Sequence, residues 1–208
     1  MTALQNWQPA IGSFLALIAI FIAASVGFWF NRKRDADLRK DEAKSIAAAL
    51  YAEAVTLQRV TARMANLVAR RHQGKGLGRR RDGFDAHFFE LVPMPPASIF
   101  AGLSAQIGKL PASILLGMAE FHSTYEEARY WLPRLEDKEE RGFSYSVLAV
   151  LRPALTAVEG VQSTLAEIEA FAGISPASKL PDLREAKDVF QWEEEWWTEA
   201  RQQDGEGS

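Results

Sequence analysis

Cysteine is absent from the 208 residues of this chain. Its absence excludes a disulfide framework, cysteine-based zinc sites and thiol nucleophiles, and it suits a reducing compartment. The alternation of apolar and polar residues that is typical of a half-buried strand is also missing. The histidines, His72, His87 and His122, lack the spacing of a metal-binding or catalytic motif. We therefore expect an all-α protein that is not an enzyme, with no catalytic residues, no cofactor and no metal ion.

Charged side chains are missing from the N-terminal part of the chain, and residues 10–30 form an uninterrupted apolar run. About 20 apolar residues suffice for a helix that crosses the roughly 30 Å hydrocarbon core of a bilayer. A cleaved signal peptide would need a basic start and a shorter apolar run, and bulky Phe28–Phe30 occupies the place of its cleavage site. The basic residues Arg32–Arg34 follow the run, which predicts one integral span with the N-terminus outside and the remainder in the cytoplasm.

Charge is divided unevenly along the rest of the chain. Residues 32–81 hold 14 Lys or Arg against 5 Asp or Glu, whereas residues 82–208 hold 10 against 22. The basic part could attract the acidic part, a neighbouring copy or an anionic bilayer.

We divide the chain into a membrane anchor with its basic flank (1–34), a cytoplasmic helical bundle of three to five helices (35–201) and a disordered tail (202–208). Residues 35–72 lack Gly and Pro, which predicts one long helix. A heptad stripe on it begins at Ile46 and Leu50 and predicts coiled-coil packing. A Gly-rich basic loop, 73–83, follows it. Further helices are predicted near residues 98–107, 111–133, 143–172 and 182–200.

Glu53 stands on this apolar stripe, where the spacing calls for Leu or Ile. A buried carboxylate is costly unless it is paired, so we expect Arg129, Tyr125 or His122 to face it from another helix. Such a residue often determines helix register or oligomeric state. The alternative is that Glu53 lies at the edge of the stripe and reaches solvent.

Basic residues cluster in and before the Gly-rich loop. Its glycines do not have the spacing of a nucleotide-binding loop. The cluster could hold an acidic protein, phospholipid headgroups or nucleic acid, although we do not expect a nucleic-acid partner; the alternative is a solvated surface. The residues concerned are Arg70, Arg71, Lys75, Arg79, Arg80 and Arg81.

The last predicted helix carries a dense group of aromatic residues, Phe190, Trp192, Trp196 and Trp197. Tryptophan is enriched at binding hot spots, so this helix is a candidate docking surface for a protein partner or a second copy. The alternative is that its apolar face closes the bundle. No small-molecule substrate is indicated.

Three segments carry a family resemblance: AAALYAEA (47–54), SIFAGLSAQIGKLP (98–111) and FHSTY (121–125). Together with the anchor and its basic flank, they resemble uncharacterised bacterial single-pass inner-membrane proteins. The resemblance implies a helical cytoplasmic domain on an inner-membrane anchor, and no activity. We expect a membrane-anchored interaction or scaffold protein; the alternative is a membrane-proximal sensor or regulator that passes a signal through the long helix.

Overall fold

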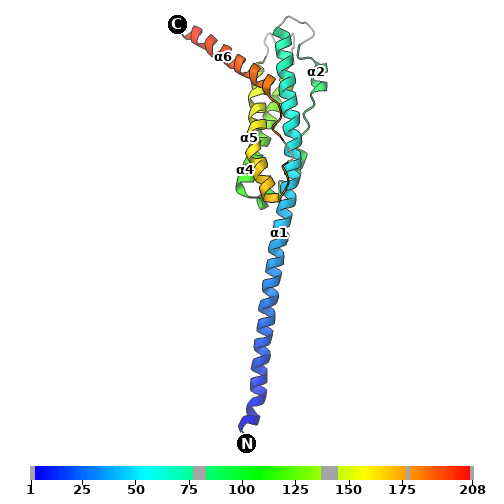
Figure 1. The fold of residues 1–208 in the computed structure, drawn as a ribbon, viewed down its shortest axis with the longest axis vertical. Helices are drawn as coiled ribbons and strands as arrows, with labels where there is room; N and C mark the ends of the chain where they lie inside the picture. Colours follow the sequence, from blue (N-terminus) through cyan, green and yellow to red (C-terminus); the bar gives the residue numbers. More distant parts are fainter. Residues whose placement is uncertain (1–2, 77–82, 137–144, 177–178, 207–208) are drawn as a thin grey trace. The chain divides into compact units, whose positions relative to one another are not determined.

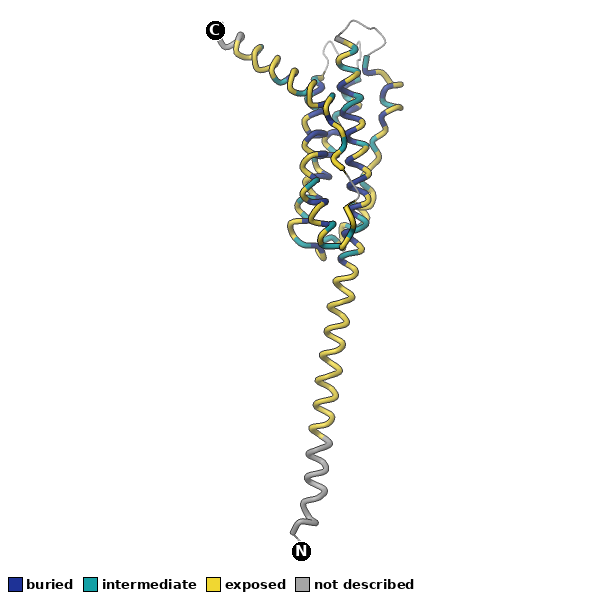
Figure 2. The backbone as a smooth tube through the Cα atoms, viewed as in Figure 1, coloured by how far each residue is buried: buried dark blue, intermediate teal, exposed yellow. Residues whose placement is uncertain are grey.

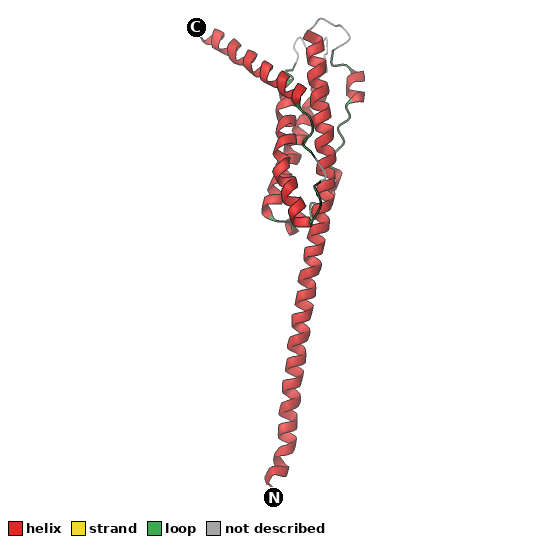
Figure 3. Ribbon diagram, in the orientation of Figure 1, coloured by secondary structure: helices red, strands yellow, loops and turns green. Residues whose placement is uncertain are grey.

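The computed structural model describes residues 3–76, 83–136, 145–176 and 179–206, excluding the side chains of 3–16, 76 and 203–206. Its described segments contain helices, turns and loops but no strand, which confirms the all-α fold (Figure 3). The α-helices are α1 (Ala3–Gly76), α2 (Ala86–Leu91), α3 (Ser98–Gly102), α4 (Ala112–Trp131), α5 (Leu148–Ala172) and α6 (Arg184–Glu206), and the 3-10 helices are η2 (Ile107–Lys109) and η3 (Leu132–Leu135).

The chain divides into two units, residues 1–44 and residues 45–208. Leu17, Phe21 and Phe28 of the first unit are each at least 68% exposed. Figure 2 colours nearly all of the described tube of this unit as exposed. Among the described residues, no helix has a stretch that is long and apolar enough to cross a membrane. Residues 10–16 of the predicted span lie outside the described side chains, so the span stays a prediction.

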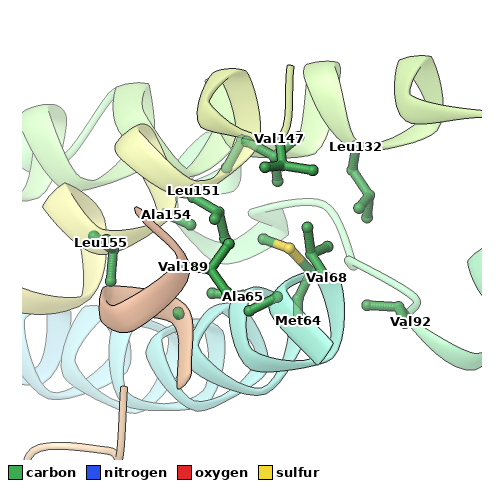
Figure 4. Packing of buried hydrophobic residues seen from close by; sticks show 14 of the residues in the cluster. Met64, Ala65, Val68, Val92, Leu132, Val147, Leu151, Ala154, Leu155 and Val189 are labelled. Carbon is green, nitrogen blue, oxygen red and sulfur yellow. The ribbon is translucent and has the colours of Figure 1, made fainter. Parts of the chain in front are cut away.

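The second unit is built on α1, α4 and α5, whose apolar faces form its core (Figures 1 and 4). Apolar residues at helical spacing on α4 are buried at Ile114, Met118, Phe121, Tyr125 and Ala128, and Leu132 at the start of η3 continues this buried face. The α1 stripe is also buried at Ile46, Leu50, Leu57 and Met64, while Val60 and Leu67 are half-buried. Helical periodicity therefore identifies the residues that form this core.

Several helix ends differ from the prediction. The helix expected over 98–107 divides into α3 and η2, and Gly108 within η2 is not in the left-handed conformation that often ends a helix. Gly173 has that conformation instead, with φ +73°, and ends α5. Helix α1 continues to Gly76 and α6 to Glu206, so part of the predicted basic loop and most of the predicted disordered tail are helical.

Close packing of α4 on α5 depends on a glycine. A Cβ atom added to Gly117 would overlap the side chain of Thr164, which is buried on α5. Gly160 on α5, in contrast, has open space around its Cα atom. The two glycines therefore form a matched pair in which the same substitution should have opposite effects.

We predict that Gly117→Ala lowers the free energy of unfolding by about 1–3 kcal/mol, because the added methyl group overpacks the α4–α5 contact. Gly160→Ala should raise it by roughly 0.5–1 kcal/mol, since alanine favours the helix and meets no neighbour. Urea unfolding followed by circular dichroism measures both. Equal effects of the two substitutions would contradict this packing.

Candidate functional site

The Glu53 carboxylate caps a helix that belongs to another part of the chain. Its side chain is buried, and its two oxygens accept hydrogen bonds from the backbone N–H groups of Ile99 (2.6 Å) and Phe100 (2.8 Å). These groups lie in the first turn of α3, and Ala97, the residue before the helix, supplies no side-chain cap. Glu53 thus satisfies N–H groups that a helix start leaves unpaired, through charge-assisted hydrogen bonds.

His122 lies next to this carboxylate but is not its ion-pair partner. Its Nε2 atom is 3.7 Å from Oε2 of Glu53, and neither ring nitrogen has a hydrogen-bond partner among the described residues. The ring packs on Phe100, with centroids 4.0 Å apart. Burial lowers the pKa of His122 below its usual 6.5, and the nearby carboxylates of Glu53 and Glu126 only partly oppose this effect. The imidazole is therefore neutral at pH 7.

The other two predicted partners of Glu53 hold the main chain that precedes α3. Arg129 donates from Nε to the carbonyl oxygen of Met94 (3.1 Å), and the Tyr125 hydroxyl donates to that of Pro95. Burial raises the pKa of Tyr125 to about 12, helped by the charge of Glu126, so the hydroxyl remains a donor. We call residues 94–100 the capped segment, because α1 and α4 together bind it at both ends.

The role of Glu53 is structural, because its carboxylate holds the capped segment. Both carboxylate oxygens are engaged by main-chain donors and the residue is only 7% exposed, so it is not positioned to act as a general base. Within the described part of the chain, no three His, Asp or Glu side chains lie close enough to hold a metal ion. The geometry supports a cap rather than a reaction centre.

Two residues of the predicted basic cluster, Arg70 and Arg71, form contacts within the bundle. Arg70 pairs with Glu185, and Arg71 donates to the carbonyl oxygen of Gly83 (2.9 Å) and pairs with Asp85 (3.3 Å). Lys75 is exposed at the end of α1. The remaining members, Arg79, Arg80 and Arg81, lie outside the described residues. Arg70 and Arg71 thus bind the protein itself.

The aromatic residues of α6 divide into a packed member and an exposed group. Phe190 is half-buried and packs against the core. Trp192, Trp196 and Trp197 are 59%, 51% and 42% exposed. The alternative that the aromatic face closes the bundle therefore holds for Phe190 and does not hold for the three tryptophans.

A histidine–carboxylate contact and an ion pair attach the first half of α6 to the bundle. Glu193 is 8% exposed and lies 2.7 Å from Nε2 of His72 on α1, and Glu194 pairs with Arg152 on α5 (2.6 Å). Beyond these residues α6 leads away from α4 and α5 (Figure 1). The tryptophans thus lie on and beyond the attached half of the helix.

A groove of about 870 Å³ runs between the end of α1 and α6, and we call it the α1–α6 groove. Two of the exposed tryptophans and the His72–Glu193 pair contribute to its surface, which is mainly apolar. Its lining consists of His72, Gln73, Lys75, Asp188, Val189, Trp192, Glu193 and Trp196.

No protein-family model, curated protein or solved structure matches this chain. The resemblance to bacterial single-pass inner-membrane proteins therefore stays a prediction, and the functional argument depends on the geometry.

We predict that Glu53→Gln lowers the free energy of unfolding by about 1.5–3 kcal/mol, because an amide cannot replace two charge-assisted hydrogen bonds. Glu120→Gln, at an exposed position of α4, is the control and should change it by less than about 0.5 kcal/mol. Urea unfolding of both variants tests the cap. A loss no larger than that of the control would show that Glu53 does not hold the capped segment.

We further predict that the protein loses stability as the pH falls below 6.5. The pKa of His122 is lower in the folded state than in the unfolded chain, so His122 binds a proton more tightly when the chain is unfolded. The free energy of unfolding is therefore highest above pH 6.5 and declines as the pH falls toward the folded-state pKa of His122. The decline should be at most about 1.4 kcal/mol per pH unit. His122→Phe keeps an aromatic ring on Phe100 and should show a smaller decline between pH 7.5 and 5. The same decline in both proteins would refute this assignment.

Proposed function

We propose that this protein is a membrane-anchored helical interaction protein without catalytic activity, and that the α1–α6 groove is its docking site. The observation that carries the proposal is the exposure of Trp192, Trp196 and Trp197 beside an apolar groove. Large exposed apolar patches mark interaction sites, and tryptophan contributes strongly to binding when a partner covers it. The engagement of Glu53 by main-chain donors supports the absence of catalysis.

Two features support the membrane anchor. The uncharged run 10–30 has the length of a span, and basic Arg32–Arg34 follow it. The apolar side chains described within the run, including Ile20 and Phe21, are exposed. A lipid environment would cover them. The basic flank Arg32–Arg34 favours a cytoplasmic location for the remainder of the chain, and we propose a bacterial inner membrane.

A sensor or regulator is the second candidate, and the length of α1 favours it. One unbroken helix, Ala3–Gly76, contains both the predicted span and the core stripe that starts at Ile46. Relay of a signal would need two arrangements of this helix. Cysteine crosslinks introduced along 46–67 would change with conditions in a sensor and stay constant in a static scaffold.

The anchor predicts that the full chain remains in the membrane pellet after an alkaline carbonate wash. Ile20→Lys combined with Ala24→Lys should release it, because each buried lysine costs about 2.5–3.5 kcal/mol at the centre of a span. Ala36→Lys, outside the predicted span, is the control and should remain in the pellet. Release of the unchanged chain would contradict the anchor.

The docking site predicts that a specific protein co-purifies with the tagged full chain from its native membrane. The triple substitution of Trp192, Trp196 and Trp197 by Ala should remove that protein, because the hot-spot contacts are lost. Leu116→Ala removes a residue on α4 that is 69% exposed, and this control should retain the partner. Recovery of the same proteins with the triple variant would contradict the docking site.

A further inference from the structure

Helix α6 carries an excess of negative charge, with eight Asp or Glu against three Lys or Arg. Part of this charge is compensated, because Glu185 and Glu194 form ion pairs with Arg70 of α1 and Arg152 of α5. The exposed residues Asp188, Glu195 and Glu199 form no ion pair within the described part of the chain. Arg184 lies close enough to Asp188 for an electrostatic interaction. Exposed carboxylates outside ion pairs thus lie on the same helix as the exposed tryptophans.

The combination of apolar surface, indole rings and carboxylates defines the chemistry that fits the groove. Asp188 lines the α1–α6 groove together with Trp192 and Trp196. An arginine or lysine side chain binds the face of an indole ring by a cation–π interaction, and an adjacent carboxylate adds a charge-assisted hydrogen bond. Apolar residues of the same ligand would cover the rest of the lining.

We propose that the α1–α6 groove binds a basic amphipathic helix of a partner protein, whose Arg or Lys side chains contact Trp192, Trp196 and Asp188. An amphipathic helix presents apolar and cationic residues on adjacent faces, and helix-in-groove binding is a common form of peptide recognition. This inference rests on the proposed function, because it assigns the chemistry of the partner to the same groove.

Charge argues against two other occupants. In a symmetric dimer through α6, each acidic helix would face an identical acidic helix, and like charges would oppose one another. An anionic bilayer would repel the same carboxylates. Of the basic residues near α6, Arg70 and Arg71 are paired with Glu185 and Asp85, and Lys75 in the groove lining adds a single positive charge against the excess of carboxylates on α6.

The test uses the full chain in nanodiscs of zwitterionic lipid and two fluorescent 18-residue helical peptides. One peptide consists of leucine and arginine, and the other has glutamate in place of every arginine. We expect the arginine peptide to bind at least about 10-fold more tightly than the glutamate peptide, after subtraction of binding to empty nanodiscs. Raising the salt concentration should reduce that preference.

Variants assign this binding to the groove. Trp192→Ala with Trp196→Ala should weaken binding of the arginine peptide by about 10-fold or more, as expected of hot-spot residues. Asp188→Lys should weaken it several-fold at low salt and less at high salt. Leu116→Ala, which removes an exposed apolar residue of α4, should leave the affinity unchanged.

Equal affinity for the two peptides, or unchanged binding by the tryptophan variant, would overturn the proposal. Concentration-dependent dimerisation through the tryptophans, or their binding to anionic vesicles, would overturn it in favour of a second copy or a lipid surface. A native partner that requires the tryptophans supports the proposed function. If, in that case, the arginine peptide is not preferred and Asp188→Lys has no effect, the proposal that the partner is basic is wrong and the docking site itself still holds. The proposed function itself fails when the triple tryptophan variant retains every native partner.

Discussion

The contact between Glu53 and the first turn of α3 is the constraint on which the arrangement around the bundle depends. Burying a carboxylate is unfavourable unless its oxygens are paired, and here the N–H groups of Ile99 and Phe100 pair them. The same hydrogen bonds fix the main chain of the capped segment against α1, while α4 binds its preceding carbonyl groups. One charged side chain thus connects α1 to a segment that has little core of its own.

The sequence singled out Glu53 because a carboxylate interrupts an apolar stripe. The sequence did not identify the hydrogen-bond partners of Glu53. These are main-chain N–H groups, which almost every residue has, so no residue type indicates them. His122 does lie near Glu53, as the sequence predicts, but burial keeps its imidazole neutral. The contact between them is therefore not an ion pair. Periodicity predicted which residues are buried, whereas pairing depends on loop geometry that periodicity does not contain.

Helix α6 shows the same division. Its existence and its aromatic content were predictable, but the exposure of its tryptophans was not. The side chain of Asn66 accepts from the N–H of Ala186 and donates to the carbonyl oxygen of Asp182, and His72 pairs with Glu193. These polar contacts across more than 110 residues set which face of α6 meets the core. As a consequence Val189 is buried, and Trp192 and Trp196 remain available to a partner.

Coverage of the α1–α6 groove in the native membrane is the most direct test of the docking account. Because the chain has no cysteine, Gln73→Cys places a single thiol at an exposed position of the groove lining. The account predicts that this thiol reacts more slowly with a maleimide in native membranes than in the purified protein, while Leu116→Cys on α4 reacts equally in both. Equal reactivity of the Gln73→Cys thiol in the two preparations would contradict it.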